Sequence, residues 1–324
     1  MTDVTARAPL SGRQHLLAHG DYTCAVATVG ASLRTLQHRG RDLVVPFDAD
    51  QVRPGYRGAI LAPWPNRVVD GRYTWAGVDQ KLALTEPDRG HALHGLAGWL
   101  DFAAEQRSPD RLELWAQLPP QEGYPHQVEV MVTYELDDLG LLTTVTGTNT
   151  GADPAPWGTA PHPYLVAGRG RVDEWSLELP AETVLTVTPD RLAPVARAAV
   201  QTDDGGRYDF RTARSLAGVE IDHAFTDLVR DLDGLCMVQV RDNSGQGVSM
   251  SFDTACPWVQ IHTADRPEPD LDRLGLAVEP MTCAPDAFNS GDGLVTLPPG
   301  GTHTARWRVQ AVTPGQAPAE AVTQ

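Results

Sequence analysis

Long apolar runs are missing from this chain of 324 residues, and none approaches the run of about 18 apolar residues that a membrane-spanning helix needs. Met1 to Arg7 contain no basic segment followed by an apolar one, so we expect no signal peptide. Positive charge is scarce as well, with 26 Lys and Arg against 42 Asp and Glu and a formal net charge of -16. Nucleic acids and anionic membranes reward clustered Lys and Arg, so we expect neither as a partner. A locally basic pocket for a small anion remains compatible with this charge.

Cysteine is also scarce. Cys24, Cys236, Cys256 and Cys283 are scattered, with no C-x-x-C pair and no matching His spacing, so no zinc site is predicted. Four cysteines in so long a chain do not indicate a disulfide framework, and we expect free thiols in a reducing cytoplasm. The G-x-S-x-G, phosphate-loop and dinucleotide-binding motifs are all missing, so no nucleotide, flavin or pyridoxal cofactor is expected.

Alternation of apolar and polar residues with a period of two dominates what is present. Arg111 to Leu118, Gln127 to Leu136 and Leu141 to Asn149 each place apolar side chains on one face, which is typical of half-buried strands. Asp137-Asp138-Leu139-Gly140 is predicted to be a turn between two of them. No window sustains a helical period beyond two or three turns, and no repeat of about 20–50 residues is apparent.

Further strands are expected throughout the chain, at 22–29, 41–47, 172–179, 183–188, 235–241, 247–253, 258–263, 274–279 and 303–312. The polar segment from Ala193 to Gly218 is predicted to be a long loop. We therefore predict one all-β domain over residues 1–312, a large antiparallel β-sandwich with its functional residues on connecting loops. Residues 313–324 are expected to form a disordered tail.

The segment Thr159 to Leu165 holds a histidine between two prolines, followed by an aromatic residue. Pro161 and Pro163 restrict the backbone on both sides of His162, and a proton donor needs such fixed positioning. Tyr164 offers a flat apolar face with a polar tip, which suits the wall of a sugar site. The alternative is a proline-rich turn in which His162 is merely hydrogen-bonded.

Three other charged residues stand out. Arg67 follows Trp64-Pro65-Asn66 and can offer a fork of donors to vicinal hydroxyls or a carboxylate, or it can simply stack on Trp64. Asp222 faces away from His223 on an extended segment and suits hydrogen bonding to sugar hydroxyls, or it caps a turn. Glu279 ends an apolar strand, where partial desolvation would raise its pKa and make it a better base, or where it forms a salt bridge.

Gly90 to Gly95 contain two histidines, His91 and His94, three residues apart. On an extended segment the two side chains point to opposite sides, so the pair is a poor metal chelate and only one can face a cleft. For His91 we favour a packed or surface position. Whether His91 or Trp258 also lines the site is left open by the sequence.

Together these residues resemble the aldose 1-epimerase (galactose mutarotase) family. The resemblance extends roughly from Leu17 to Val312. It rests on five motifs in order: Pro65-Asn66-Arg67 with Gly71-Arg72-Tyr73, Leu93-His94-Gly95, His162-Pro163-Tyr164, Asp222-His223-Ala224-Phe225, and Val278-Glu279-Pro280 with Pro285-Asp286-Ala287 and Asn289.

The resemblance implies the galactose mutarotase-like supersandwich, no cofactor, and interconversion of the α and β anomers of an aldohexose. It makes Glu279 the general base and His162 the general acid, with Arg67, His94 and Asp222 around the sugar. A charged Glu279 is expected to raise the pKa of the nearby imidazole. The expected partner is a small monosaccharide, and the expected state is a monomer or homodimer.

Two positions depart from the common family pattern, Leu96 after His94-Gly95 and Leu165 after His162-Pro163-Tyr164. They affect pocket walls more than proton transfer. The versions here look more like a sub-branch associated with less common sugars, including sulfonated glucose. Two rival functions are a non-catalytic carbohydrate-binding sandwich and a glycoside hydrolase that uses Asp222 and Glu279 as its carboxylates.

Overall fold

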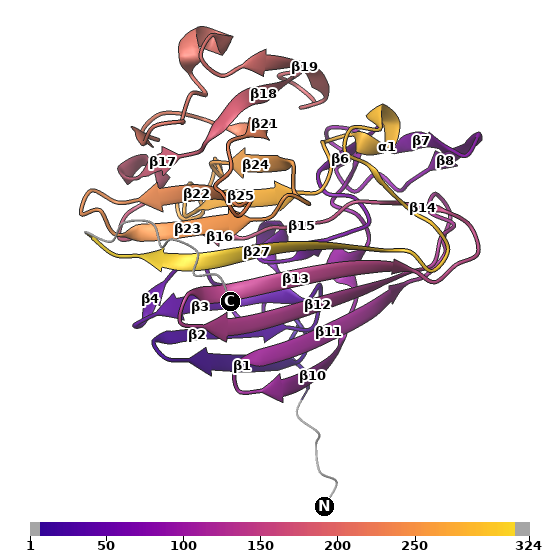
Figure 1. Cartoon of the computed structure of the whole chain (residues 1–324), viewed down its shortest axis with the longest axis horizontal. Helices are drawn as coiled ribbons and strands as arrows, with labels where there is room; N and C mark the ends of the chain where they lie inside the picture. The colour runs from indigo at the N-terminus through magenta and orange to yellow at the C-terminus, as the bar shows by residue number, and fades with distance from the viewer. Residues whose placement is uncertain (1–6, 315–324) are drawn as a thin grey trace, which may run out of the picture.

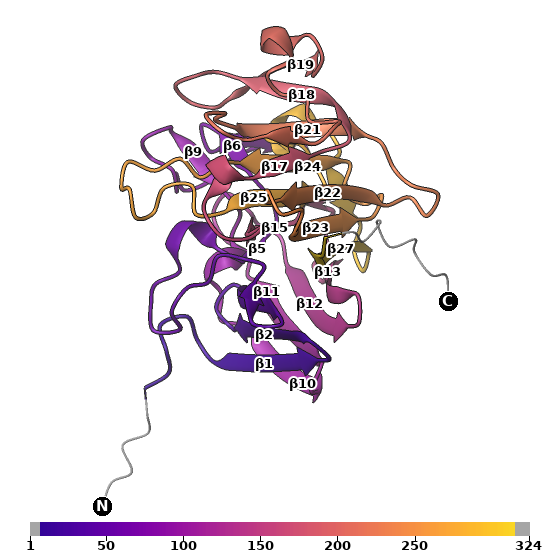
Figure 2. The same cartoon turned by 90° about the vertical axis from the view of Figure 1, so that its left-hand side faces the viewer.

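The computed structural model describes residues 7–314, and these residues form an almost entirely β-stranded molecule (Figures 1 and 2). Within this range the one α-helix is α1 (Ala287–Ser290), and 3-10 helices lie at Pro54–Tyr56, Ala97–Trp99, Val172–Glu174 and Asp203–Gly206. None of them is long and apolar enough to cross a membrane. The all-β prediction is confirmed. The predicted tail lies outside the described residues except for 313 and 314.

The larger sheet is antiparallel and has nine strands. In spatial order they are β10 (Ala103–Ser108), β11 (Arg111–Leu118), β12 (Val128–Asp137), β13 (Gly140–Asn149), β27 (Thr302–Val312), β23 (Gly247–Phe252), β22 (Cys236–Arg241), β17 (Ser176–Glu178) and β20 (Arg214–Ser215). The last strand of the described residues, β27, pairs with β13 on one side and β23 on the other, so it joins early and late segments (Figure 1).

The second sheet has six antiparallel strands. In spatial order they are β16 (Tyr164–Leu165), β25 (Leu276–Met281), β24 (Trp258–His262), β21 (Asp222–Leu228), β18 (Ala181–Val187) and β19 (Pro194–Ala199). Alternate residues of β24 separate its two faces: Val259 and Ile261 join the main hydrophobic core, whereas Gln260 and His262 point the other way. One face of this sheet is therefore packed and the other carries polar groups.

Short strands complete the molecule. A four-stranded sheet contains β1 (Gln14–His19), β2 (Tyr22–Ala27), β3 (Ser32–His38) and β4 (Arg41–Asp42). Four two-stranded ladders pair β5 (Ile60–Leu61) with β15 (Ala160–Pro161), β6 (Arg67–Val69) with β9 (His91–Leu93), β7 (Arg72–Trp75) with β8 (Val78–Lys81), and β14 (Ala155–Trp157) with β26 (Val295–Leu297).

The alternation that predicted the central strands also builds the core. In β12 the residues Val128, Val130, Val132, Tyr134 and Leu136 are at most 2% exposed, and the strand pairs in unbroken register with β11 and β13. Burial of each such side chain contributes about 1.5–3 kcal/mol, which fixes the register because a slip of one residue would expose the whole set.

The prediction of a long loop over 193–218 is wrong in part, because β19 and β20 lie inside it. Strand β19 pairs with β18 at the edge of the six-stranded sheet, and its middle residues are exposed. An edge strand with little buried surface has no strong apolar alternation, so its sequence pattern resembles that of a loop.

Candidate functional site

All six residues predicted for the site line one cavity of about 270 Å³, on the polar face of the six-stranded sheet. They are Arg67, His94, His162, Tyr164, Asp222 and Glu279. Asp222 and Glu279 come from β21 and β25, on either side of β24. The short ladders bring Arg67 and His94 to the same place, because β6 begins at Arg67 and β9 ends just before His94.

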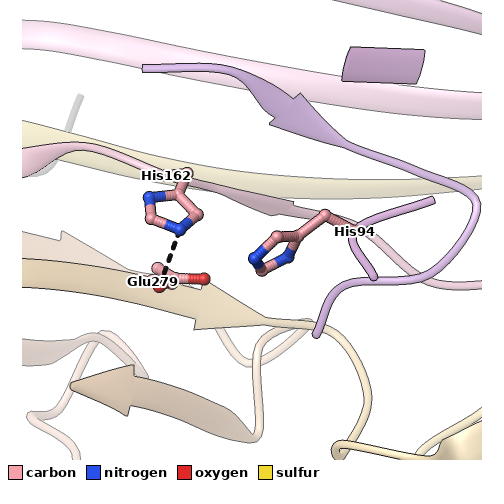
Figure 3. Close-up of side chains that lie close together, drawn as sticks. All are labelled: His94, His162 and Glu279. Atoms are coloured by element: carbon pink, nitrogen blue, oxygen red, sulfur yellow. Dashed lines mark ion pairs between the residues drawn. The ribbon is translucent and has the colours of Figure 1, made fainter. Parts of the chain in front are cut away.

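His162 lies on the connection between β15 and β16, and its backbone is fixed on both sides. Its N–H donates to the carbonyl of Ala59 and its own carbonyl accepts from the N–H of Gly58, at 3.0 and 2.8 Å. The side chain therefore stands on a rigid segment, as the two flanking prolines predicted. Figure 3 shows its imidazole pointing at Glu279, with the ring of His94 beside the pair.

The His162–Glu279 pair is close and almost completely buried. His162 Nε2 lies 3.4 Å from Glu279 Oε1, and the two side chains are 5% and 2% exposed. The remaining polar atoms of the pair, His162 Nδ1 and Glu279 Oε2, have no hydrogen-bond partner among residues 7–314. Buried polar atoms are seldom left unpaired, so this spot is suited to a polar ligand.

The expected rise in the pKa of His162 is wrong. Burial, followed by the nearby His262, lowers the pKa of His162 to about 3. Burial, followed by the charge of Asp222, raises the pKa of Glu279 well above its usual value. Desolvation penalises whichever member carries a charge, so both members tend to be neutral and a proton shared by the pair rests on the carboxyl.

His94 has a defined tautomer because Asn66 donates its backbone N–H to His94 Nδ1, at 3.2 Å. Burial, then the neighbouring His162 and Arg67, hold the pKa of His94 well below its usual value, so the ring is neutral and carries its proton on Nε2. The φ angles of Asn66 and His94, 54° and 61°, lie in the left-handed region, which is strained for residues other than glycine. The ladder of β6 and β9 holds both residues in this conformation, and the Nε2–H of His94 is an N–H donor directed into the cavity.

His94, His162 and Glu279 also place possible metal-ligand atoms within 4.8 Å of one another. A metal on Nε2 of His94 would require the proton to move to Nδ1, where the Asn66 N–H already donates. That conflict makes the donor set a poor fit to a resident metal and a better fit to sugar hydroxyls. The expectation of no metal stays a prediction.

Arg67 is held by an acidic residue that the sequence did not suggest. Its Nε and Nη2 donate to the two oxygens of Glu86 at 2.8 and 3.0 Å, and Nη2 also lies 3.8 Å from Asp222 Oδ2. Burial lowers the pKa of Arg67, but the bonds to Glu86 and the charge of Asp222 outweigh it and raise the net pKa. The guanidinium is therefore fixed and charged, as a positioned donor requires.

Asp222 is held ionised in the same network. Gln260 Nε2 donates to its Oδ1 at 2.6 Å. Burial opposes ionisation, but the neighbouring His262 and Arg67 outweigh it, so the pKa of Asp222 lies below its usual value. The residue does not cap a turn. Its neighbour His223 faces the other way and contacts the ring of Tyr208, as the extended segment predicted.

Tyr164 forms a wall beside His162, with the two rings 5.1 Å apart. Its hydroxyl donates to the carbonyl of Gly55 at 3.0 Å, and burial raises its pKa to about 12. It is thus a neutral, fixed surface. The two residues that the sequence left open, His91 and Trp258, do not line this cavity: His91 is packed between Asp70 and Arg191, and Trp258 belongs to a hydrophobic cluster.

The sequence reading missed several lining residues, among them Tyr56, Glu86, Gln260, His262 and Arg266. Gln260 and His262 had a readable signal, because they alternate with apolar residues inside a predicted strand. Glu86 had none, since it lies in an irregular segment and is defined by its contact with Arg67.

This geometry can do acid–base chemistry on a small polyhydroxylated ligand. At its centre lies a buried pair close enough to exchange a proton, while Arg67, Asp222 and His94 offer fixed donors and an acceptor around it. Such side chains match the hydroxyls of a single sugar ring, and the cavity volume suits one ring.

Comparison with known proteins gives a consistent result. Residues 13–310 match the family model for aldose 1-epimerase. The chain is 35% identical over 294 residues to the uncharacterized protein YihR of Escherichia coli K12, covering 90% of this chain and 91% of YihR. It is 25% identical over 264 residues to galactose mutarotase of Mus musculus, covering 73% of this chain and 72% of that one.

Solved structures agree on the fold. The GalM/aldose epimerase homologue from C. elegans superimposes with a TM-score of 0.80 at 20% identity, over 92% of this chain and 99% of that chain. Galactose 1-epimerase from Lactobacillus acidophilus NCFM gives a TM-score of 0.76 at 16% identity, over 92% and 94%. The predicted galactose mutarotase-like sandwich is therefore confirmed.

Proposed function

Because the chain belongs to the aldose 1-epimerase family, we propose that it interconverts the α and β anomers of a hexose by acid–base opening and closing of the sugar ring. The observation that supports this most is the buried His162–Glu279 pair, 3.4 Å apart, in a cavity of about 270 Å³. We assign the two proton transfers to this pair.

The reaction needs one proton to leave the C1 hydroxyl and one to reach the ring oxygen. With its proton moved to His162, Glu279 is the base that accepts the C1 hydroxyl proton, and the His162 imidazolium donates to the ring oxygen. The C1–O5 bond then breaks to give an aldehyde and a C5 hydroxyl, the C1–C2 bond rotates, and the reverse transfers close the ring on the other face. No net proton is gained or lost, so a pair that holds a single proton is sufficient.

Sugar binding provides the means to move that proton within the pair. Hydroxyls that donate to Glu279 supply the hydrogen bonds that burial denies to the carboxylate, and the charge of Arg67 also favours its ionised form. We further propose that Asp222 accepts from sugar hydroxyls while Arg67 and His94 donate to sugar oxygens.

For the hexose itself, an anionic group on C6 is supported by two cations next to Tyr164, Arg266 in the cavity and Arg57 in the adjoining pocket. If His162 serves the ring oxygen, C5 and its C6 substituent lie toward Tyr164. Arg57 lies 5.9 Å from the Tyr164 ring centroid, and Arg266 lines the cavity beside Tyr164. Neither forms an ion pair with a carboxylate within residues 7–314. Guanidinium forks match sulfonate and phosphate oxygens.

The test is anomer-exchange NMR at equilibrium with galactose, glucose, and glucose carrying a 6-phosphate or a 6-sulfonate. We expect enzyme-dependent exchange in at least one sugar and the highest kcat/KM with an anionic one. Arg266→Gln should raise KM for the anionic sugar and leave a neutral one unchanged. Equal efficiency on all four would refute the anionic assignment, and no exchange in any would refute the mutarotase.

The same assay separates the rival functions. A carbohydrate-binding module would bind sugar without accelerating exchange, and Glu279→Gln would change nothing but affinity. A glycoside hydrolase using Asp222 and Glu279 would release the phenol from a nitrophenyl glycoside. The four described cysteines are free and buried, which supports the proposal that the protein acts in the cytoplasm.

A further inference from the structure

Tyr56 contacts two of the three histidines that line the cavity, His94 and His162. Its ring lies 4.7 Å from that of His94 in an edge-to-face contact and 6.2 Å from that of His162 in a stacked one. The ring lines the cavity itself. It therefore contacts both imidazoles from a segment outside the six-stranded sheet that carries Glu279.

The backbone of Tyr56 is strained, which indicates that its surroundings hold the residue in place. Its φ angle is 56°, in the left-handed region that a bulky side chain rarely adopts. Such strain persists only where neighbouring groups determine the conformation. Here the Tyr56 carbonyl accepts from the N–H of Ala59, which is the residue whose own carbonyl anchors His162.

A buried arginine, Arg53, packs next to the Tyr56 ring. Arg53 is 5% exposed and forms no ion pair with a carboxylate among residues 7–314. Its guanidinium donates to Ser32 Oγ at 2.7 Å and to the carbonyls of Val29 and Gly98. It lies 5.9 Å from the Tyr56 ring and 4.5 Å from that of Trp99.

Burial lowers the pKa of Arg53 only to about 10, so the group stays charged near neutral pH. Keeping an unpaired cation in the interior is costly. Carbonyl dipoles and two aromatic faces compensate the charge. The Arg53 guanidinium fits here because residue 30 is glycine: a Cβ added at Gly30 would lie 2.5 Å from Arg53 Nη1. A buried cation kept at this cost is explained if Arg53 holds in place a side chain that the reaction needs.

We propose that Tyr56 is the roof of the catalytic cavity, which keeps water from the His162–Glu279 pair and packs against the sugar ring, and that Arg53 is the positioning residue that holds it. The inference rests on the proposed function for its kinetic part. Its structural part, the exclusion of water from His162, can be tested without any activity.

Removing the roof has a specific consequence for the dependence on pH. The active pair holds one proton, and burial disfavours both the state with two protons and the state with none. Water entering through a missing Tyr56 ring would favour both charged states, so the acid limb of the pH–rate profile would move up and the alkaline limb would move down. The charged and titratable groups that act on the pair and remain in place are Arg67, His94, Tyr164, Asp222 and His262 in the cavity and Arg53 outside its lining.

The experiment compares Tyr56→Phe, Tyr56→Ala and Arg53→Lys with a control, Tyr208→Leu. Tyr208 also contacts a histidine ring, that of His223 at 4.5 Å, but it does not line the cavity. We expect Tyr56→Ala to lose about 10–100-fold in kcat/KM and to narrow the pH profile from both sides. Tyr56→Phe should keep the profile and most of the rate, and Arg53→Lys should fall between the two. Tyr208→Leu should match the wild type.

NMR titration of the histidine Cε1–H signals gives the second readout. The pKa of His162 should rise toward the ordinary range in Tyr56→Ala and stay depressed in Tyr56→Phe and Tyr208→Leu. An unchanged His162 titration and unchanged pH limits in folded Tyr56→Ala would overturn the proposal. If the wild type shows no anomer exchange, the proposed function fails, and the titration still decides whether Tyr56 excludes water.

Discussion

Replacing Glu279 by glutamine removes the carboxyl that pairs with His162, and it does so with almost no change of shape. Glutamine cannot take the C1 hydroxyl proton, so the base is lost while the sugar contacts of Arg67, His94 and Asp222 remain. General acid–base assistance is worth about 10²–10⁴-fold, or about 3–5 kcal/mol of activation free energy. We expect kcat to fall by that factor, toward the rate in water, with a small change in KM.

The fold should survive this substitution. Glu279 is 2% exposed, and burial raises its pKa, so the protein already holds this side chain in surroundings that favour a neutral group. A neutral amide avoids the desolvation of a carboxylate, and the thermal unfolding midpoint should be unchanged or higher.

The assay is two-dimensional exchange NMR, in which cross-peaks between the α and β anomeric protons report the rate at equilibrium. Glu178→Gln is the matched control, since Glu178 lies on β17, outside the cavity. Retention of the wild-type rate by folded Glu279→Gln would refute the assignment of the base. Loss of the rate in Glu178→Gln as well would show that the effect is not specific to the site.

Three further predictions follow from the same geometry. The pH–rate profile should be broad. Activity should fall near pH 3, where the pair takes a second proton on His162, and again above the raised pKa of Glu279, where the pair loses its proton. A narrow optimum near pH 6 would contradict the neutral pair. Glu86→Gln should raise KM and cost about 1–3 kcal/mol of stability in a denaturant titration, because Arg67 loses its bidentate partner; an unchanged KM would show that Arg67 does not bind the sugar. Dialysis against a chelator should leave kcat unchanged, and a loss restored by Zn²⁺ would show that His94, His162 and Glu279 hold a metal after all.

The central strands could be predicted because each of them buries only one of its two faces. Burial in β11, β12 and β13 alternates with a period of two, and the predicted range of β11 coincides with the observed one. The edge strand β19 could not be predicted, since its exposed residues carry no alternation. The segment 41–47 was expected to be one strand, but its ladder with β3 ends at Asp42, and the chain then contacts β16 through an isolated bridge at Val44.

The site could be predicted in part because its motifs follow family order, and each predicted residue reaches the cavity. Their partners could not be predicted, since pairing between distant segments is not readable from spacing: Glu86 lies 19 residues from Arg67, and Asn66 fixes the tautomer of His94 from 28 residues away. The direction of the His162 pKa shift was wrong for a related reason. A nearby carboxylate raises an imidazole pKa only while it stays charged, and the sequence could not show that both groups would be so deeply buried.

The most direct test of the central claim is a double-mutant cycle on the catalytic pair, measured by anomer exchange for His162→Asn, Glu279→Gln and the double variant. If the two side chains share one proton and act as a unit, the double variant should be about as slow as the slower single variant. Losses that multiply in the double variant would mean that the two residues act independently, and the account of a shared proton would be wrong.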